Sequence, residues 1–166
     1  MINEQINIDP KHFAHVKDIL RNVIISTDES NHSKIAFIIS VAIAAKFKIK
    51  IDQENISKKI LTKTGNNRQV SLLDIKQIIH ELGYATKAVQ THQHQFQDYL
   101  SKQILITQDN QNNFITLIDA SESNIYFIFG KIKTDVILYS LPTNKFLEHL
   151  NNHKFLILTN PIIKFS

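Results

Sequence analysis

Residues 70–89 read VSLLDIKQIIHELGYATKAV and contain the signal that decides the fold. Ser71 and Asp74 have the spacing of a helix start, in which the serine caps backbone donors and the acid three residues later reaches back. Leucine and isoleucine then recur at helical spacing as far as Leu82, and Gly83 is a suitable left-handed stop. From Tyr84 the sequence is typical of a strand. The stretch therefore predicts a helix followed directly by a strand.

The sequence before this stretch predicts helices. Residues 11–26 carry their apolar side chains on one face of a helix. Residues 33–46 are apolar almost all round, which is typical of a helix in the middle of a domain. A shorter helix is predicted near residues 53–61.

The sequence after it predicts mostly strands, at residues 103–107, 114–119, 125–129, 136–139 and 154–159. Short helices are expected at residues 95–100 and 142–150, and a polar turn at residues 109–113. Helices followed by a strand meander indicate an α+β domain, with a helical first half packed on an antiparallel sheet.

Length and composition limit the possible functions. The 166 residues suit a single domain, and the absence of cysteine excludes disulfides, thiolate metal sites and a cysteine nucleophile. The net charge of +4 comes from scattered lysines, and Arg21 and Arg68 are the only arginines, so nucleic acid is not an expected partner. Residues 35–47 are too short to cross a bilayer, and the N-terminus lacks an apolar signal segment. A cytoplasmic protein is expected.

The sequence offers no motif for a cofactor or a metal. With only three glycines it has no phosphate-binding loop. His92 and His94 would share a face on a strand, and His12 and His15 lie three apart on a predicted helix, but neither pair has a third ligand nearby. Phe129 alternates with core positions on its strand, so it belongs either to the core or to an apolar surface beside a groove.

Several segments, in order along the chain, resemble the peptidase C39 family over roughly residues 27–161. They are residues 32–36, 70–76, 82–89, 104–106, 113–117 and 125–130. The resemblance implies a papain-like fold. It also implies a role in ABC exporters, because active members of that family form their N-terminal cytoplasmic domain and cut leader peptides after a double glycine.

The chain departs from the C39 pattern at each position that carries the family's chemistry. Ser33 stands at the cysteine position, Asn113 at the histidine position and Gly130 at the aspartate position, and the oxyanion glutamine falls near Thr27. Asn113 cannot take a proton at neutral pH, and His32 at a helix start diverges from its neighbour Ser33. The resemblance therefore implies a chain that is not an enzyme and has no catalytic residues.

Catalytically empty C39-like domains are carried by the hemolysin-type and large-adhesin exporters, which secrete calcium-binding RTX proteins. The resemblance thus implies one domain spanning residues 1–166, with a core of about 11–161, from the N-terminus of a longer ABC transporter at the cytosolic face of the inner membrane. It would dock or hold unfolded RTX cargo in a groove. The groove residues expected are Ser33, Asn113, Phe129 and Gly130. The alternatives are a scaffold or regulatory module that binds a partner protein, and a residual peptidase acting on double-glycine leaders.

Overall fold

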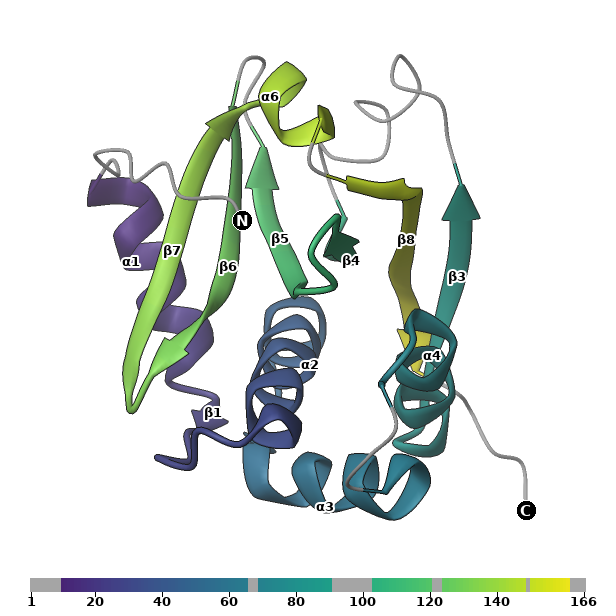
Figure 1. Ribbon diagram of the computed structural model, residues 1–166. Helices are drawn as coiled ribbons and strands as arrows, with labels where there is room; N and C mark the ends of the chain where they lie inside the picture. Colours follow the sequence, from purple (N-terminus) through teal and green to yellow (C-terminus); the bar gives the residue numbers. More distant parts are fainter. Residues whose placement is uncertain (1–9, 66–68, 91–102, 121–123, 149, 162–166) are drawn as a thin grey trace.

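The computed structural model describes residues 10–65, 69–90, 103–120, 124–148 and 150–161 (Figure 1). The elements of the first half are α1 (Pro10–Leu20), β1 (Val23–Ile24), α2 (Asn31–Phe47), β2 (Ile51–Asp52), α3 (Gln53–Thr64) and α4 (Leu72–Glu81). Those of the second half are β3 (Tyr84–Gln90), β4 (Leu105–Asp109), β5 (Phe114–Ala120), β6 (Asn124–Ile132), β7 (Asp135–Pro142), α6 (Thr143–Glu148) and β8 (Leu150–Pro161). The helix predicted at residues 95–100 and the pair His92 and His94 lie outside the described residues.

A six-stranded sheet forms the centre of the domain. Its order is β3-β8-β4-β5-β6-β7, and every neighbouring pair is antiparallel. Only β4 to β7 follow one another as the predicted meander, because β8 inserts between β3 and β4. The predicted α+β class, with helices packed on an antiparallel sheet, is confirmed.

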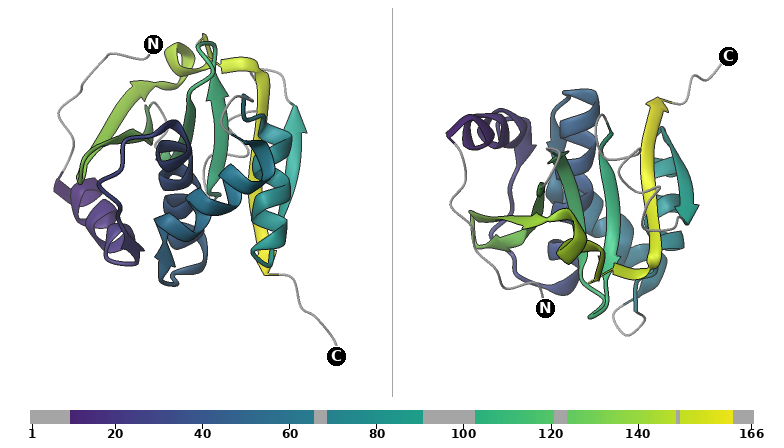
Figure 2. Two further views of the ribbon diagram at one scale, coloured as in Figure 1. Left: turned by 60° about the horizontal axis from the view of Figure 1, so that its bottom comes forward. Right: turned by 90° about the horizontal axis from the view of Figure 1, so that it is seen from above.

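Helix α2 packs across the middle of the sheet, on the same side as α4 (Figure 2). Ser30 caps its start by accepting a hydrogen bond from the Ser33 amide, and the chain leaves the helix at Lys48 with φ 55°. The buried Thr116 hydroxyl of β5 donates to the carbonyl of Ile38 at 2.8 Å, a polar contact between the helix and the sheet. This contact fixes the position of α2 along β5.

The two faces of the sheet bury separate apolar cores, because side chains alternate along each strand. On the helix side, Ile106, Phe114 and Ile128 pack with the buried residues of α2, α3 and α4. On the other side, Phe127 packs against Phe146 of α6, with ring centroids 5.2 Å apart. Both faces of the central strands are therefore covered.

The capped helix and strand predicted at residues 70–89 are confirmed. Both hydrogen bonds of the predicted capping box between Ser71 and Asp74 are present. Gly83 follows the helix with φ 99°, and β3 begins at the next residue. Lys76 of α4 donates to the carbonyl of Thr86 at 2.8 Å, which ties the helix to this edge strand of the sheet.

The first predicted helix is too long. It ends at Leu20, because Val23 and Ile24 form a short strand that pairs in parallel with Ile51 and Asp52. The predicted helix at residues 142–150 is also shorter than expected: residues 143–148 are helical, while Pro142 ends a strand and Leu150 begins one. In both cases pairing with a distant strand overrides the local helical pattern.

Candidate functional site

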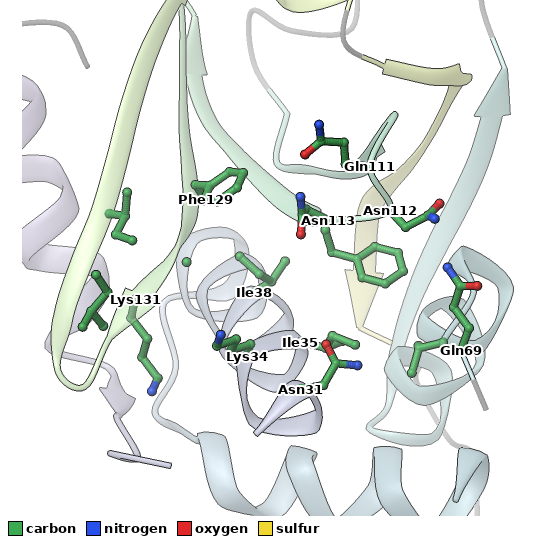
Figure 3. A pocket seen from close by; sticks show the side chains of 15 residues that line it. Asn31, Lys34, Ile35, Ile38, Gln69, Gln111, Asn112, Asn113, Phe129 and Lys131 are labelled. Atoms are coloured by element: carbon green, nitrogen blue, oxygen red, sulfur yellow. The ribbon is translucent and has the colours of Figure 1, made fainter. Parts of the chain in front are cut away.

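An open groove of about 620 Å³ lies between the first turns of α2, the loop that joins β4 to β5, and the β6–β7 hairpin (Figure 3). Its lining residues are Asn31, Lys34, Ile35, Ile38, Gln69, Val70, Gln111, Asn112, Asn113, Phe114, Phe129, Gly130, Lys131, Ile132 and Ile137. These residues are far apart in the sequence, and the antiparallel order β4-β5-β6-β7 brings them together.

The groove combines neutral polar groups with an apolar wall. Five side-chain amides and two lysines line it, and none of its lining residues is an acid. The apolar wall includes Phe129, which lies edge-on to Tyr139 at 5.5 Å between ring centroids, and Ile132, which is 60% exposed. Such a surface offers both hydrogen bonds and apolar contact to a ligand.

The loop between β4 and β5 forms one rim of the groove and is organised by Asp109. This carboxylate is fully buried, and its Oδ1 accepts hydrogen bonds from the backbone amides of Gln111 and Asn113, both at 2.9 Å. Its Oδ2 accepts from the Asn113 side-chain amide at 3.2 Å. Asn112 has φ 65°, a conformation that asparagine tolerates better than most residues. The predicted polar turn is thus a structured rim.

Lys131 of β6 ties the hairpin to the chain that precedes α2. Lys131 is only 4% exposed. Its ammonium group donates hydrogen bonds to the carbonyls of Asp28 and Lys133 at 3.1 and 3.0 Å. Burial lowers the pKa of Lys131, and the nearby Glu29 and Asp28 oppose that shift. The backbone amide of Lys133 also donates to Glu29. Because Lys131 already contacts carbonyls, the exposed Lys34 is the positive charge most available to a ligand.

Ser33, the residue at the C39 cysteine position, does not line the groove. It is 1% exposed, and the Gln53 amide donates to its hydroxyl and to its carbonyl oxygen, each at 2.8 Å. The other end of Gln53 accepts from the backbone amide of Ser26, also at 2.8 Å. The neighbouring His32 contacts the carbonyl of Gly65 at 3.0 Å through Nε2. The serine hydroxyl is therefore paired with an amide.

Three of the four residues expected in a binding groove lie together. Asn113, Phe129 and Gly130 line it, Ser33 is buried in the first turn of α2, and Thr27 is exposed and is not a lining residue. Sequence reasoning missed Asp109 and Gln53 as organising residues. The signal for Asp109 was its place at the start of a polar turn, whereas nothing local marked Gln53 as buried.

The described residues contain no group of three or more metal-ligating side chains. None of the helices in the described ranges is long and apolar enough to cross a membrane.

The fold is similar to that of two solved peptidase domains. One is a double glycine motif protease from an AMS/PCAT transporter, in complex with the leader peptide: 15% identity, TM-score 0.61, covering 81% of this chain and 88% of the protease. The other is the peptidase domain of Streptococcus ComA, a bifunctional ABC transporter involved in quorum sensing: 10% identity, TM-score 0.60, covering 81% and 96%. No protein-family model and no curated protein matches the sequence.

The comparison confirms the expected fold and corrects one prediction. The chain has the papain-like, C39-like fold of peptidase domains of ABC transporters. The prediction that the chain is not an enzyme is contradicted, because the proteins that share its fold are peptidases. The absence of cysteine excludes a cysteine nucleophile, but it does not by itself exclude enzymatic activity.

Proposed function

We propose that this domain docks an extended, unfolded segment of protein cargo in the groove beside α2, as part of a type I secretion ABC exporter. The observation that carries the proposal is the lining of the groove, which offers amides and lysines without a single acid. The fold supports it, because one protein with the same fold is a transporter protease in complex with a leader peptide.

The groove suits an extended chain better than a folded surface. An unfolded segment exposes backbone N–H and C=O groups at every residue, and side-chain amides can pair with both kinds. The apolar wall that includes Phe129 and Ile137 would receive the alternate side chains of such a segment. Affinity is expected to be modest, because an unfolded segment loses conformational entropy when it binds.

The charge of the groove points to an acidic cargo. The exposed Lys34 supplies positive charge to a lining that contains no acid. Calcium-binding RTX repeats carry carboxylates, and without calcium they would be both unfolded and negatively charged. We therefore propose calcium-free RTX repeats as the cargo.

The proposal extends to the parent protein. The chain would be one domain, with a core of about residues 11–161, of a longer ABC transporter, and it would face the cytosol. The peptidase domain of ComA, which has the same fold, belongs to an ABC transporter and supports this placement.

The first experiment titrates the domain with a fluorescent synthetic RTX-repeat peptide, with and without calcium. The groove-filling variant is Gly130→Val, since a Cβ at Gly130 would meet no atom within 4 Å and the fold should tolerate it. The matched control is Ala88→Val, on the exposed face of edge strand β3 at the far side of the sheet. Binding without calcium that is lost in Gly130→Val and kept in Ala88→Val would support the proposal. Equal binding by both variants would exclude this groove.

A charge reversal tests the choice of an acidic cargo. Lys34→Glu should weaken binding of the peptide by about tenfold at low salt, and the difference should shrink as salt screens the charges. Lys58→Glu makes the same change on α3, away from the groove lining, and should have little effect. If both variants behave alike, overall charge rather than the groove attracts the peptide.

A second candidate function, action on double-glycine leaders, is favoured by the leader peptide bound to a protease of the same fold. Incubation of the domain with a synthetic leader peptide, followed by mass spectrometry, would detect cleavage after the double glycine. Cleavage that disappears in Ser33→Ala would establish the leader as the substrate. If neither the leader nor the RTX peptide binds, the remaining reading is a scaffold or regulatory module that binds a partner protein.

A further inference from the structure

The side-chain amide of Asn113 is held in one orientation by the buried carboxylate of Asp109. A carboxylate oxygen only accepts hydrogen bonds, so the Asn113 group that lies 3.2 Å from Asp109 Oδ2 must be the donating NH₂ end. The acceptor end of the amide, Oδ1, must then face away from Asp109. In Figure 3 this oxygen lies on the side of the groove where Ile38 and Lys34 of α2 are found.

Asp109 itself has no freedom to turn. Its other oxygen accepts from two backbone amides, those of Gln111 and Asn113, and the side chain is fully buried. The other amides of the groove, such as Asn31 and Asn112, are exposed, and no described contact decides which end they present. An unheld amide can offer either a donor or an acceptor at similar cost, whereas the end of the Asn113 amide that faces away from Asp109 is the acceptor oxygen.

We propose that Asp109 is a positioning residue that makes Asn113 a fixed hydrogen-bond acceptor in the groove, and that the group it accepts is a backbone N–H of the bound segment. This inference rests on the proposed function and adds the chemistry of one subsite. An extended chain supplies such a donor at every residue except proline, so the subsite would tolerate most side chains and reject proline.

The variant Asp109→Asn tests the positioning without removing the rim. Its oxygen can still accept the two backbone amides, while its NH₂ replaces the oxygen that faces Asn113. The Asn113 amide must then turn over and present NH₂ to the groove. The matched control is Asn110→Ala, an exposed change in the same loop at a position that does not line the groove.

Nuclear magnetic resonance of the side-chain amides tests the first half of the proposal without any ligand. One NH₂ proton of Asn113, assigned from its absence in Asn113→Ala, should be shifted downfield and protected from exchange by its bond to the carboxylate. Both signatures should disappear in Asp109→Asn and persist in Asn110→Ala. An Asn113 amide that exchanges freely in the unmodified protein would overturn the proposal.

Binding of backbone-ester peptides tests the second half. The probe is the RTX-repeat peptide and a series of analogues, each with one backbone N–H replaced by oxygen. One analogue should bind the unmodified protein about fivefold more weakly, the cost of one lost hydrogen bond. The same analogue should lose less than about twofold with Asp109→Asn or Asn113→Ala, because the acceptor is already gone. Asn113→Ala keeps this test available if Asp109→Asn fails to fold.

The outcomes separate this inference from the proposed function. If the peptide binds and Gly130→Val abolishes binding, but no ester analogue depends on Asn113, the docking function stands and the subsite is wrong. If the peptide does not bind the unmodified protein at all, the docking function and the subsite fail together, and the resonance data then show only whether Asp109 orders its own loop.

Discussion

Replacing Gln53 with leucine tests whether one buried amide holds the start of the central helix in place. Gln53 makes three hydrogen bonds of 2.8 Å, to the Ser26 amide and to the hydroxyl and carbonyl of Ser33. Leucine has nearly the same volume, so the change leaves little cavity, but the Ser26 and Ser33 groups lose their partner. A buried polar group left unpaired costs roughly 1–3 kcal/mol, so the loss of a partner by these three groups predicts a decrease of about 3 kcal/mol in the free energy of unfolding.

Urea denaturation followed by circular dichroism would measure this loss against a typical domain stability of about 5–15 kcal/mol. Gln77→Leu makes the same chemical change at an exposed position of α4 and should shift stability by less than about 0.5 kcal/mol. The reasoning is refuted if Gln53→Leu costs less than about 1 kcal/mol. In that case water or another backbone group would satisfy Ser26 and Ser33, and the glutamine would not be what holds the start of α2.

Three other substitutions test single contacts of the fold. Ser71→Ala removes a helix cap and should lower the free energy of unfolding by about 1 kcal/mol in urea denaturation. Thr116→Val removes the bond to the Ile38 carbonyl and should cost about 1 kcal/mol, with the melting temperature falling by a few degrees. Asp28→Asn should make the free energy of unfolding fall less steeply as the pH becomes acidic. Hydrogen bonds from Ser30 hold the pKa of Asp28 below its ordinary value, so this contribution is present near neutral pH and is lost as the pH falls through the folded-state pKa; thermal melts from pH 6 to about pH 2 would show it.

Signals contained within a few residues were readable from the sequence. The cap at Ser71, the stop at Gly83 and the polar turn that starts at Asp109 each depend on neighbours within four residues, and the structure has all three. The buried helix α2 was also readable, because a helix that is apolar all round must be covered on all sides. The family resemblance then placed Asn113 and Gly130, which do line the groove.

Features that depend on distant pairing were not readable. Val23 and Ile24 continue the apolar spacing of the first helix, and only their pairing with residues 51–52 makes them a strand. The insertion of β8 between β3 and β4 likewise depends on contacts across the whole second half. Gln53 looks like any polar residue at a helix start, and its burial depends on Ser33, twenty residues earlier in the chain.

The groove and its rim depend on the same carboxylate. Burying Asp109 costs desolvation free energy, and three hydrogen bonds offset that cost, two from the backbone of the loop and one from Asn113. The shape of the rim is therefore fixed by polar pairing, while the opposite wall is fixed by the packing of Phe129 on Tyr139. Filling the groove at Gly130 should consequently block binding and leave the rim ordered, whereas disrupting Asp109 should disorder the rim and the subsite together. Comparing the exchange rates of the Gln111 and Asn113 backbone amides in Gly130→Val with those in Asp109→Ala separates the two effects. Equal protection in both variants would show that the rim does not need its carboxylate.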